Sequence, residues 1–422
     1  MSDYSARFKS VAKKHIERIN GSVYPFNSLL LDTFFNELNH SGTEELKNSD
    51  IELLTNQLVN QLLFGPITNM ELFLTEDCNL ACTYCFVHEK VNNSMPIDLA
   101  IDSINFLVLY SGNSGKLNIT LFGGEPLLEK ENIYRIVEHC NKIEKQSKSK
   151  KITFSATTNG TLVDEELLKR VQGRVNFLLS FDGDEETHDL YRKDKAGNGT
   201  FKRILDKISL LKRYQGWLGS RMTVMPDTVH KLNRNVSYQF DLGINQFLIG
   251  LANDIDWPEQ ALIEYEAQMR QIGRFYLKKK KEKAPIRITF FEKEKDELEC
   301  SENVWGCGAG RNTISVTTNG DIYPCSKFVG YEKFDCPELK LGNIYEGITN
   351  MKARKMLAKM KPDDYKVCTS CDEMNACRGG CPADNYYKNK SLYKPAPSAC
   401  ELKKAGNRIL RELSVELDGS IM

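Results

Sequence analysis

Several features that mark common protein classes are scarce or missing in this sequence. It has only six histidines, and none stands in an H-x3-H or HExxH spacing, so a histidine-rich zinc site is not expected. Lys+Arg and Asp+Glu both number 57, which gives a formal net charge of zero. Bulk charge therefore does not favour nucleic acid or an anionic membrane as a partner.

Long apolar segments are also missing. No apolar run approaches the roughly 18 residues of a membrane-spanning helix. The first segment, "MSDYSARFKSVAKK", lacks the apolar centre of a secretory signal peptide. We therefore expect a cytoplasmic protein with no membrane partner. The chain has 422 residues, 41% of them hydrophobic, which is enough for a large core and for two or three domains.

Cysteine, by contrast, is abundant. Thirteen cysteines in a reducing compartment favour metal or redox chemistry over disulfides. Eleven of them form a front and a rear group: Cys78, Cys82 and Cys85, then Cys300, Cys307, Cys325, Cys368, Cys371, Cys377, Cys381 and Cys400. The front C-x3-C-x2-C set is one thiolate short of a tetrahedral zinc site and of a four-iron cluster. Cys140 and Cys336 stand apart, and we expect Cys140 to be a small buried hydrophobe on a helix.

Strand-like and helix-like segments alternate between about residues 70 and 281. The expected strands are residues 70–76, 116–122, 152–158, 175–181, 220–226 and 245–252. Segments with apolar residues at three- and four-residue spacing separate them, which predicts strand–helix units in an α/β fold with a parallel sheet. Six units are too few for an eight-stranded barrel, so we expect an open, partial barrel.

Distinctive short sequences follow the first four predicted strands. The front cysteines follow the first, "GGEP" (123–126) the second and "TNGT" (158–161) the third, while "SFDG" (180–183) crosses the end of the fourth. Parallel α/β folds bind ligands at the carboxyl ends of their strands. The sequence therefore places the candidate site at this end of the barrel.

The pattern changes from about residue 297, where the alternation stops and cysteines become dense. Residues 313–325 predict a hairpin that turns on Asn319-Gly320 in a type I′ turn. We divide the chain into an N-terminal region (1–66), the partial barrel (67–285) and a cysteine-rich domain (286–422). Two structural zinc sites are an alternative for the rear group, but its spacings are loose for a zinc ribbon, so iron–sulfur ligation is favoured.

The two cysteine patterns resemble known families. C-x3-C-x2-C after the first strand, followed by "GGEP", resembles the signature of the radical S-adenosylmethionine (radical SAM) superfamily. The rear spacing, C-x12-G-x4-C, then C-x2-C-x5-C-x3-C and a last cysteine, is similar to the SPASM extension of that superfamily. The resemblance covers roughly residues 70–400. It implies a partial (β/α)6 barrel, S-adenosylmethionine as cofactor, and three [4Fe–4S] clusters, one that binds S-adenosylmethionine and two auxiliary.

The resemblance also implies ligand sets for the clusters. Cys78, Cys82 and Cys85 would hold three irons and leave the fourth to S-adenosylmethionine; a zinc knuckle completed by His88 is the alternative. The nearer auxiliary cluster would take Cys300, Cys307, Cys325 and Cys381, and the outer one Cys368, Cys371, Cys377 and Cys400. Cys300 lies outside the seven-cysteine pattern. Without it, the nearer cluster would have an open iron for a substrate thiolate.

Seven further residues are candidate contacts to S-adenosylmethionine, each implied by the resemblance: Tyr84 for adenine, Gly123, Gly124 and Glu125 for the methionine amino group, Ser180 for the ribose or carboxylate, Arg192 for the carboxylate, and Asn159. Each has an ordinary alternative. Tyr84 fits a loop-packing tyrosine, "GGEP" and "SFDG" fit turns, and Arg192 fits a surface salt bridge.

For function, the resemblance implies an oxidoreductase that removes a hydrogen atom from a peptide or protein by means of a 5′-deoxyadenosyl radical, with flavodoxin or ferredoxin as electron donor. We expect a maturase of a small ribosomally made peptide that forms a cysteine thioether. Formylglycine formation, as by anaerobic sulfatase maturases, a C–C crosslink and a non-catalytic electron carrier are alternatives. Sulfatase maturases usually have an aspartate after the Gly-x4-Cys cysteine, where this chain has Ser326. The N-terminal region would bind a leader peptide by strand pairing or form a helical cap.

Overall fold

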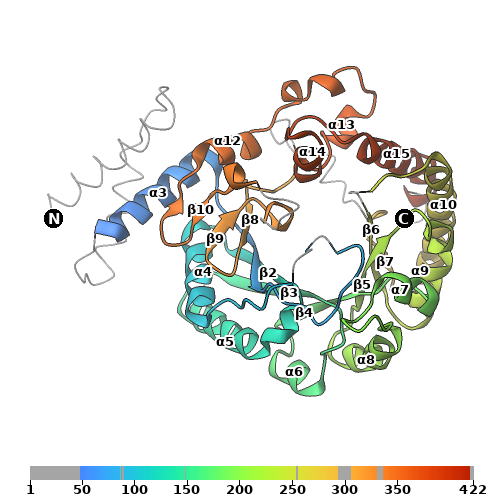
Figure 1. Cartoon of the computed structure of the whole chain (residues 1–422), viewed down its shortest axis with the longest axis horizontal. Helices are drawn as coiled ribbons and strands as arrows, with labels where there is room; N and C mark the ends of the chain where they lie inside the picture. Colours follow the sequence, from blue (N-terminus) through green and yellow to red (C-terminus); the bar gives the residue numbers. More distant parts are fainter. Residues whose placement is uncertain are drawn as a thin grey trace.

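The central element is a curved sheet ringed by helices (Figure 1). The computed structural model describes residues 48–85, 87, 90–147, 149–252, 255–292, 306–329 and 336–418. Seven parallel strands run through its barrel part: β1 (Asn69–Thr75), β2 (Lys116–Gly123), β3 (Lys151–Thr158), β4 (Val175–Ser180), β5 (Gly219–Val224), β6 (Gln246–Leu251) and β7 (Arg287–Ile288). The six predicted strands are confirmed to within two residues, and β7 adds a short seventh.

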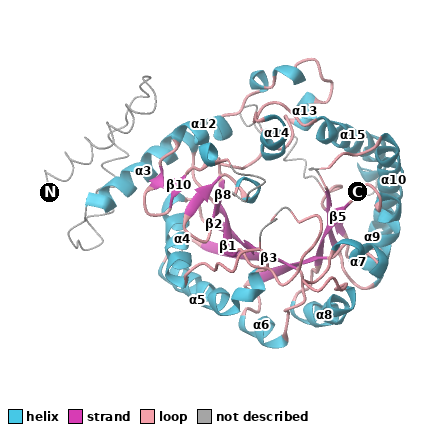
Figure 2. Cartoon of the chain, viewed as in Figure 1, coloured by secondary structure: helices cyan, strands magenta, loops and turns pink. Residues whose placement is uncertain are grey.

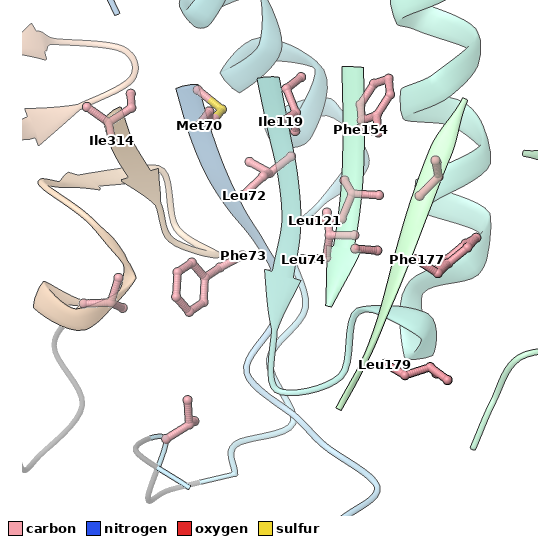
Figure 3. Packing of buried hydrophobic residues seen from close by; sticks show 14 of the residues in the cluster. Met70, Leu72, Phe73, Leu74, Ile119, Leu121, Phe154, Phe177, Leu179 and Ile314 are labelled. Atoms are coloured by element: carbon pink, nitrogen blue, oxygen red, sulfur yellow. The ribbon is translucent and has the colours of Figure 1, made fainter. Parts of the chain in front are cut away.

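Helices cover the outer face of this sheet (Figure 2). They are α4 (Ile97–Tyr110), α5 (Lys130–Gln146), α6 (Glu165–Arg170), α7 (Glu185–Tyr191), α8 (Phe201–Tyr214), α9 (Leu232–Asp241) and α10 (Glu259–Lys281). The apolar residues under them come from alternate strand positions. Leu72, Ile119 and Phe154, on three neighbouring strands, are all buried (Figure 3). The open α/β barrel that alternation predicted is therefore the observed architecture.

The opposite, inner face of the sheet is different in character. In β2, Leu117, Ile119 and Leu121 are buried, whereas Asn118 is exposed and Thr120 half-buried. Because strand side chains alternate between the two faces, the exposed positions point into the barrel. The inner face thus keeps solvent access and polar side chains.

The cysteine-rich region does not form a sheet of its own. Its strands β8 (Thr313–Val316), β9 (Asp321–Tyr323), β10 (Gly342–Asn343) and β11 (Gly347–Ile348) extend the barrel sheet in the order β11-β10-β9-β8-β1. β8 runs parallel to β1, and the remaining pairs are antiparallel. The sequence pattern predicted a separate domain, but the backbone hydrogen bonds of the sheet continue into it.

The same region reaches the other side of the ring. Its helices are α12 (Met351–Ala358), α13 (Met374–Cys377), α14 (Pro382–Asn389) and α15 (Pro397–Asp418). On α15, Glu412 pairs with Arg270 of α10 at 2.6 Å, and Arg408 pairs with Glu266. The cysteine-rich region therefore spans the opening between β1 and α10, as Figure 1 shows.

The predicted hairpin is present, but its predicted turn type is wrong. A type I′ turn needs positive φ at both central residues. Gly320 has φ +85°, whereas Asn319 is absent from the residues with positive φ. Instead, Gly320 N donates to Thr317 O (2.9 Å) and Thr317 N to Asp321 O (3.0 Å). This is the longer loop that ends in a left-handed glycine.

Helix α3 (Asn48–Phe64) covers the edge strand β11. The Asn56 side chain donates to Ile348 O (2.9 Å) and accepts from Ile348 N (3.0 Å), so it satisfies both backbone groups of an edge residue. This part of the N-terminal region is thus a helical cap. Leader recognition was predicted for the whole N-terminal region, residues 1–66, of which 1–47 lie outside the described residues, and it stays a prediction.

Candidate cofactor site

The front cysteines lie on the loop that follows β1. Two backbone bonds fasten this loop to the segment after α7: Ala81 N donates to Lys193 O (2.8 Å) and Thr83 N to Tyr191 O (3.0 Å). An isolated bridge pairs Leu80 with Asp194. The loop is therefore held in an extended form at the carboxyl end of the barrel.

Positive groups and N–H donors surround the front sulfur atoms. Leu80 N lies 3.4 Å and Asn159 Nδ2 3.9 Å from Cys78 Sγ, and Lys90 Nζ lies 2.9 Å from Cys85 Sγ. Burial raises the pKa of Cys78 to about 11, and the Leu80 N–H opposes this. A thiolate-bound cluster carries negative charge and is stabilised by such donors, so these residues fit a thiolate-held iron–sulfur cluster.

Cys82 lies near a guanidinium. Burial raises the pKa of its thiol, and Arg192 opposes the rise. Cys85 also raises it, which places the neighbouring thiol within electrostatic range. Cys82 likewise raises the pKa of Cys78, so each front thiol lies within electrostatic range of another, and their ligation of one cluster stays a prediction. His88, the proposed fourth zinc ligand, lies outside the described residues.

The "GGEP" turn packs directly on the cysteine loop. Gly124 N donates to Thr75 O and Glu125 N to Asp77 O, both at 2.9 Å. A side chain at Gly123, where φ is +144°, would collide with Thr75 O, and one at Gly124 would collide with Asp77 O. Both glycines are thus explained by close approach to the protein's own loop. Their contact to S-adenosylmethionine stays a prediction.

Glu125 is buried and bonded within the protein. Its carboxylate accepts from Leu127 N (3.0 Å), Thr158 Oγ1 (2.8 Å) and Asn159 N (2.7 Å). Burial raises its pKa to about 7, against the lowering effect of these donors. Glu125 therefore joins the ends of β2 and β3, and three of its roughly four acceptor positions are used.

Asn159 links the end of β3 to the cysteine loop. Besides its approach to Cys78 Sγ, its Nδ2 donates to Asn79 Oδ1 at 2.8 Å, and its Oδ1 accepts from Thr161 N at 3.0 Å. Asn159 therefore lies beside the cysteine loop, and its hydrogen-bond partners there are protein atoms.

Arg192 is buried in an ion pair with Asp182. Arg192 Nε lies 2.8 Å from Asp182 Oδ2, and Nη2 lies 3.0 Å from Oδ1. The hydroxyl of Tyr84 and the N–H of Thr223 (2.8 Å) also donate to this carboxylate, so its acceptor positions are full. The surface salt-bridge alternative for Arg192 is therefore wrong. That Asp182 binds both Arg192 and Tyr84 could not be predicted from the sequence.

Ser180 ends β4, where it is half-buried and paired in register with Arg221 of β5. Both residues alternate with buried neighbours, so they face the barrel interior. Ser180 thus lies at the predicted rim, next to a guanidinium that sequence reasoning passed over.

The rear cysteines separate into two groups. Burial raises the pKa of Cys325, and negative charge on Glu71, Cys381 and Cys307 adds to the rise. Burial raises the pKa of Cys381 to about 11, with Lys327 opposing it and Cys307 contributing. Cys307, Cys325 and Cys381 are thus neighbours, which is the grouping the resemblance implied for the nearer cluster. Cys300 lies outside the described residues.

The second rear group contains the other four cysteines. Burial raises the pKa of Cys400 to about 11, and Cys377, Cys368 and Cys371 add to the rise. Among the described residues, no three His, Cys, Asp or Glu side chains are grouped closely enough to hold a single metal ion. A four-iron cluster does not need such a group, since each of its irons takes one thiolate. The assignment of ligands to clusters stays a prediction.

Glu71 is a site residue that sequence reasoning missed. Its carboxylate, on the inner face of β1, accepts from Ser315 Oγ (2.5 Å), Ser326 N (2.5 Å) and Ser326 Oγ (3.2 Å). Through these hydrogen bonds, Glu71 connects β1 of the barrel to the loop that contains Cys325. The alternation in β1 was the available signal, since a glutamate interrupts its apolar residues. Cys140 and Cys336 are buried, as predicted for Cys140.

Comparisons with known proteins agree with this geometry. The family model of the radical SAM superfamily matches residues 72–236, and that of the SPASM iron–sulfur cluster-binding domain matches residues 307–372. The chain therefore contains a radical SAM domain and a SPASM domain. These two domains imply S-adenosylmethionine and [4Fe–4S] clusters as cofactors, including the auxiliary clusters that SPASM domains bind.

Individual relatives fall into two functional kinds. A cysteine-type anaerobic sulfatase-maturating enzyme of Clostridium novyi is 27% identical over 73% of this chain and 85% of its own length. The antilisterial bacteriocin subtilosin biosynthesis protein AlbA of Bacillus subtilis is 25% identical over 75% and 67%. The structure of anSMEcpe with bound AdoMet and Cp18Cys peptide shares the fold, with a TM-score of 0.66, 22% identity, and coverage of 84% and 98%.

No helix in the described part of the chain combines the length and the apolar character that crossing a lipid bilayer requires.

Proposed function

We propose that this enzyme is a maturase of a small ribosomally made peptide and that it installs a cysteine thioether. The observation that carries the proposal is Ser326, which follows Cys325 where sulfatase maturases usually have an aspartate and which is bonded to Glu71. A relative that serves bacteriocin biosynthesis and a related structure with a bound peptide support a peptide substrate.

Cys78, Cys82 and Cys85 would hold the cluster that binds S-adenosylmethionine. Lys90 Nζ lies 2.9 Å from Cys85 Sγ, and the charge of Arg192 acts on Cys82. When bound, the cofactor supplies one-electron cleavage chemistry that removes a hydrogen atom from a substrate C–H bond. The protein's own part is positional. Glu125, Asn159 and the Asp182–Arg192 pair fix the loops around the site, and a flavodoxin or ferredoxin would be the electron donor.

The atoms and electrons of the crosslinking reaction can be counted. One C–H and one S–H bond of the peptide are broken and one C–S bond forms, so the peptide loses two hydrogen atoms. They leave as a hydrogen atom, a proton and an electron. The rear cysteine groups would hold the clusters that accept this electron.

The test is anaerobic turnover of the reconstituted enzyme with S-adenosylmethionine, reductant and a cysteine-containing precursor peptide. We expect a product that has lost one hydrogen pair and one alkylatable thiol. A matched peptide with that cysteine changed to serine must stay unmodified. Formation of 5′-deoxyadenosine with both peptides unchanged in mass would overturn the crosslinking proposal.

Formylglycine formation is the second candidate, because the Clostridium novyi relative is a cysteine-type sulfatase maturase. The probe is the Cp18Cys peptide that is bound in the anSMEcpe structure. Oxidation of its cysteine to formylglycine replaces sulfur by oxygen, whereas a thioether keeps the sulfur. The mass of the product therefore separates the two functions.

A further inference from the structure

Two of the rear cysteines stand directly before helical turns. Cys325 precedes the 3₁₀ turn Ser326–Phe328, and Cys381 precedes α14. The first N–H groups of a helix have no partner within it, so they can donate to an atom in front of the helix. A backbone hydrogen bond from Lys327 to Cys325 opposes the rise that burial causes in the pKa of this thiol. Asp384 makes a backbone bond of the same kind to Cys381, where burial raises the pKa to about 11.

The side chains of these two donor residues form an ion pair. Lys327 Nζ lies 2.6 Å from Asp384 Oδ1, although the two residues are 57 positions apart in the sequence. Their side chains are 38% and 13% exposed, so both are partly withdrawn from water. The pair therefore connects the segment that contains Cys325 to the segment that contains Cys381.

The ammonium group of Lys327 also acts on the two sulfur atoms. Burial lowers the pKa of this lysine, but negative charge on Cys381, Asp384 and Cys325 raises it above its usual value. Glu71 brings further negative charge near Cys325. The two cysteines therefore lie within electrostatic range of one ammonium group and two carboxylates.

Charges in these positions decide how readily an iron–sulfur cluster takes up an electron. A cluster gains negative charge when it is reduced, so a nearby cation and N–H donors to the ligand sulfur atoms stabilise the reduced form. A nearby carboxylate stabilises the oxidised form for the same reason. Lys327 acts on two of the three neighbouring cysteines that fit the nearer auxiliary cluster.

We propose that the ion pair of Lys327 and Asp384 sets the reduction potential of the nearer auxiliary cluster. Lys327 raises the potential, and Asp384 limits the rise because it neutralises part of that charge. Both are positioning residues, which act through the charge that they place beside the sulfur atoms. A raised potential favours this cluster as acceptor of the electron that thioether formation releases, a consequence that rests on the proposed function.

The experiment is a redox titration of the anaerobically reconstituted enzyme, followed by electron paramagnetic resonance and made without any peptide. The signal that is missing in Cys381→Ala identifies the nearer cluster. Lys327→Met removes the positive charge and keeps the apolar stem of the side chain, and Asp384→Asn removes the negative charge. The matched control is Lys340→Met, because Lys340 Nζ also lies 2.6 Å from a carboxylate, that of Asp321, and its side chain is also 38% exposed.

The two variants should shift the potential in opposite directions. In Lys327→Met, the equilibrium constant for one-electron reduction of the nearer cluster should fall about tenfold, which corresponds to about 59 mV, because the ammonium is gone and the Asp384 carboxylate remains. In Asp384→Asn it should rise by a similar factor. Lys327→Arg keeps the charge and should stay close to the wild type, and Lys340→Met should change nothing.

A role in shape alone would not give shifts of opposite sign. Unchanged potentials in Lys327→Met and Asp384→Asn, or shifts of the same sign, overturn the proposal. If Lys327→Met does not retain the cluster, Asp384→Asn and Lys327→Arg decide alone, and loss of about four irons per chain from either of them also overturns it. Because no peptide is present, the result is independent of whether any peptide is crosslinked.

Discussion

The guanidinium of Arg192 donates two hydrogen bonds, 2.8 and 3.0 Å long, to the carboxylate of Asp182. Their side chains are 8% and 1% exposed, so the pair is removed from water. Asp182 lies two residues after β4, whereas Arg192 follows α7 and lies between Tyr191 and Lys193, whose carbonyl oxygens bind the cysteine loop. The pair thus connects the barrel rim to the loop of Cys82.

Substitution of Asp182 by Asn should destabilise the barrel strongly. The change leaves the Arg192 charge buried without its counter-charge, which costs on the order of 3 kcal/mol. Chemical unfolding measures the loss. The matched control is Glu185→Gln, which breaks an exposed pair with Lys202 and should cost less than about 1 kcal/mol. Equal losses in the two variants would contradict the importance of burial.

His188 should make stability depend on pH. It is buried, its Nδ1 accepts from Asp182 N (3.4 Å) and its Nε2 lies 3.1 Å from Thr200 Oγ1. Burial lowers its pKa from 6.5 to about 3. Between these values the unfolded chain binds a proton on this residue that the folded chain does not, so the contribution of His188 to stability falls as pH falls below 6.5.

His188 contributes about 1.4 kcal/mol per pH unit in that window, while buried Glu125, with a pKa of about 7, contributes with the opposite sign. Unfolding curves at several pH values measure the slope, and His188→Gln should lower it by about 1.4 kcal/mol per pH unit relative to the wild type. The control is the exposed His230, whose replacement by Gln should leave the slope unchanged. A slope in His188→Gln equal to that of the wild type would contradict this contribution of His188.

Replacement of Cys377 and of Cys381, which are close in the sequence, should affect different auxiliary clusters. Cys381 lies with Cys307 and Cys325, whereas Cys377 lies with Cys368, Cys371 and Cys400. Cys377→Ala and Cys381→Ala should therefore change different signals in the electron paramagnetic resonance spectrum of the reduced enzyme. Loss of the same signal in both variants would refute the two groups.

Replacement of Cys78, Cys82 and Cys85 by Ala should remove one cluster only. Three four-iron clusters predict about twelve irons per chain, so the triple variant should retain about eight. It should also form no 5′-deoxyadenosine. A Cys140→Ala variant, which changes a buried cysteine away from the site, should keep the full iron content. Iron analysis after anaerobic reconstitution checks both.

Much of the fold could be predicted from local patterns in the sequence. The alternation of apolar residues located β1 to β6, because a strand covered by helices buries every second side chain. The type I′ turn was mispredicted because Asn319-Gly320 also suits the longer loop with a single left-handed glycine. Sequence preference alone does not choose between these loops.

Contacts between distant segments could not be read from the sequence. The pairing of β8 with β1 joins residues more than 200 positions apart, and so does the bond from Ser326 to Glu71. The partner of Arg192 was equally hidden, because an arginine at the end of a helix fits a ligand contact, a surface ion pair or a buried ion pair. Only the folded chain brings Asp182 to it.

The most direct test of a peptide-modifying radical SAM enzyme is deuterium transfer. The cysteine-containing precursor peptide is made with deuterium on the carbon that becomes bonded to sulfur, and 5′-deoxyadenosine is analysed by mass spectrometry after anaerobic turnover. The account predicts deuterium in 5′-deoxyadenosine together with loss of one cysteine thiol from the peptide. Unlabelled 5′-deoxyadenosine with the peptide thiol intact would contradict it.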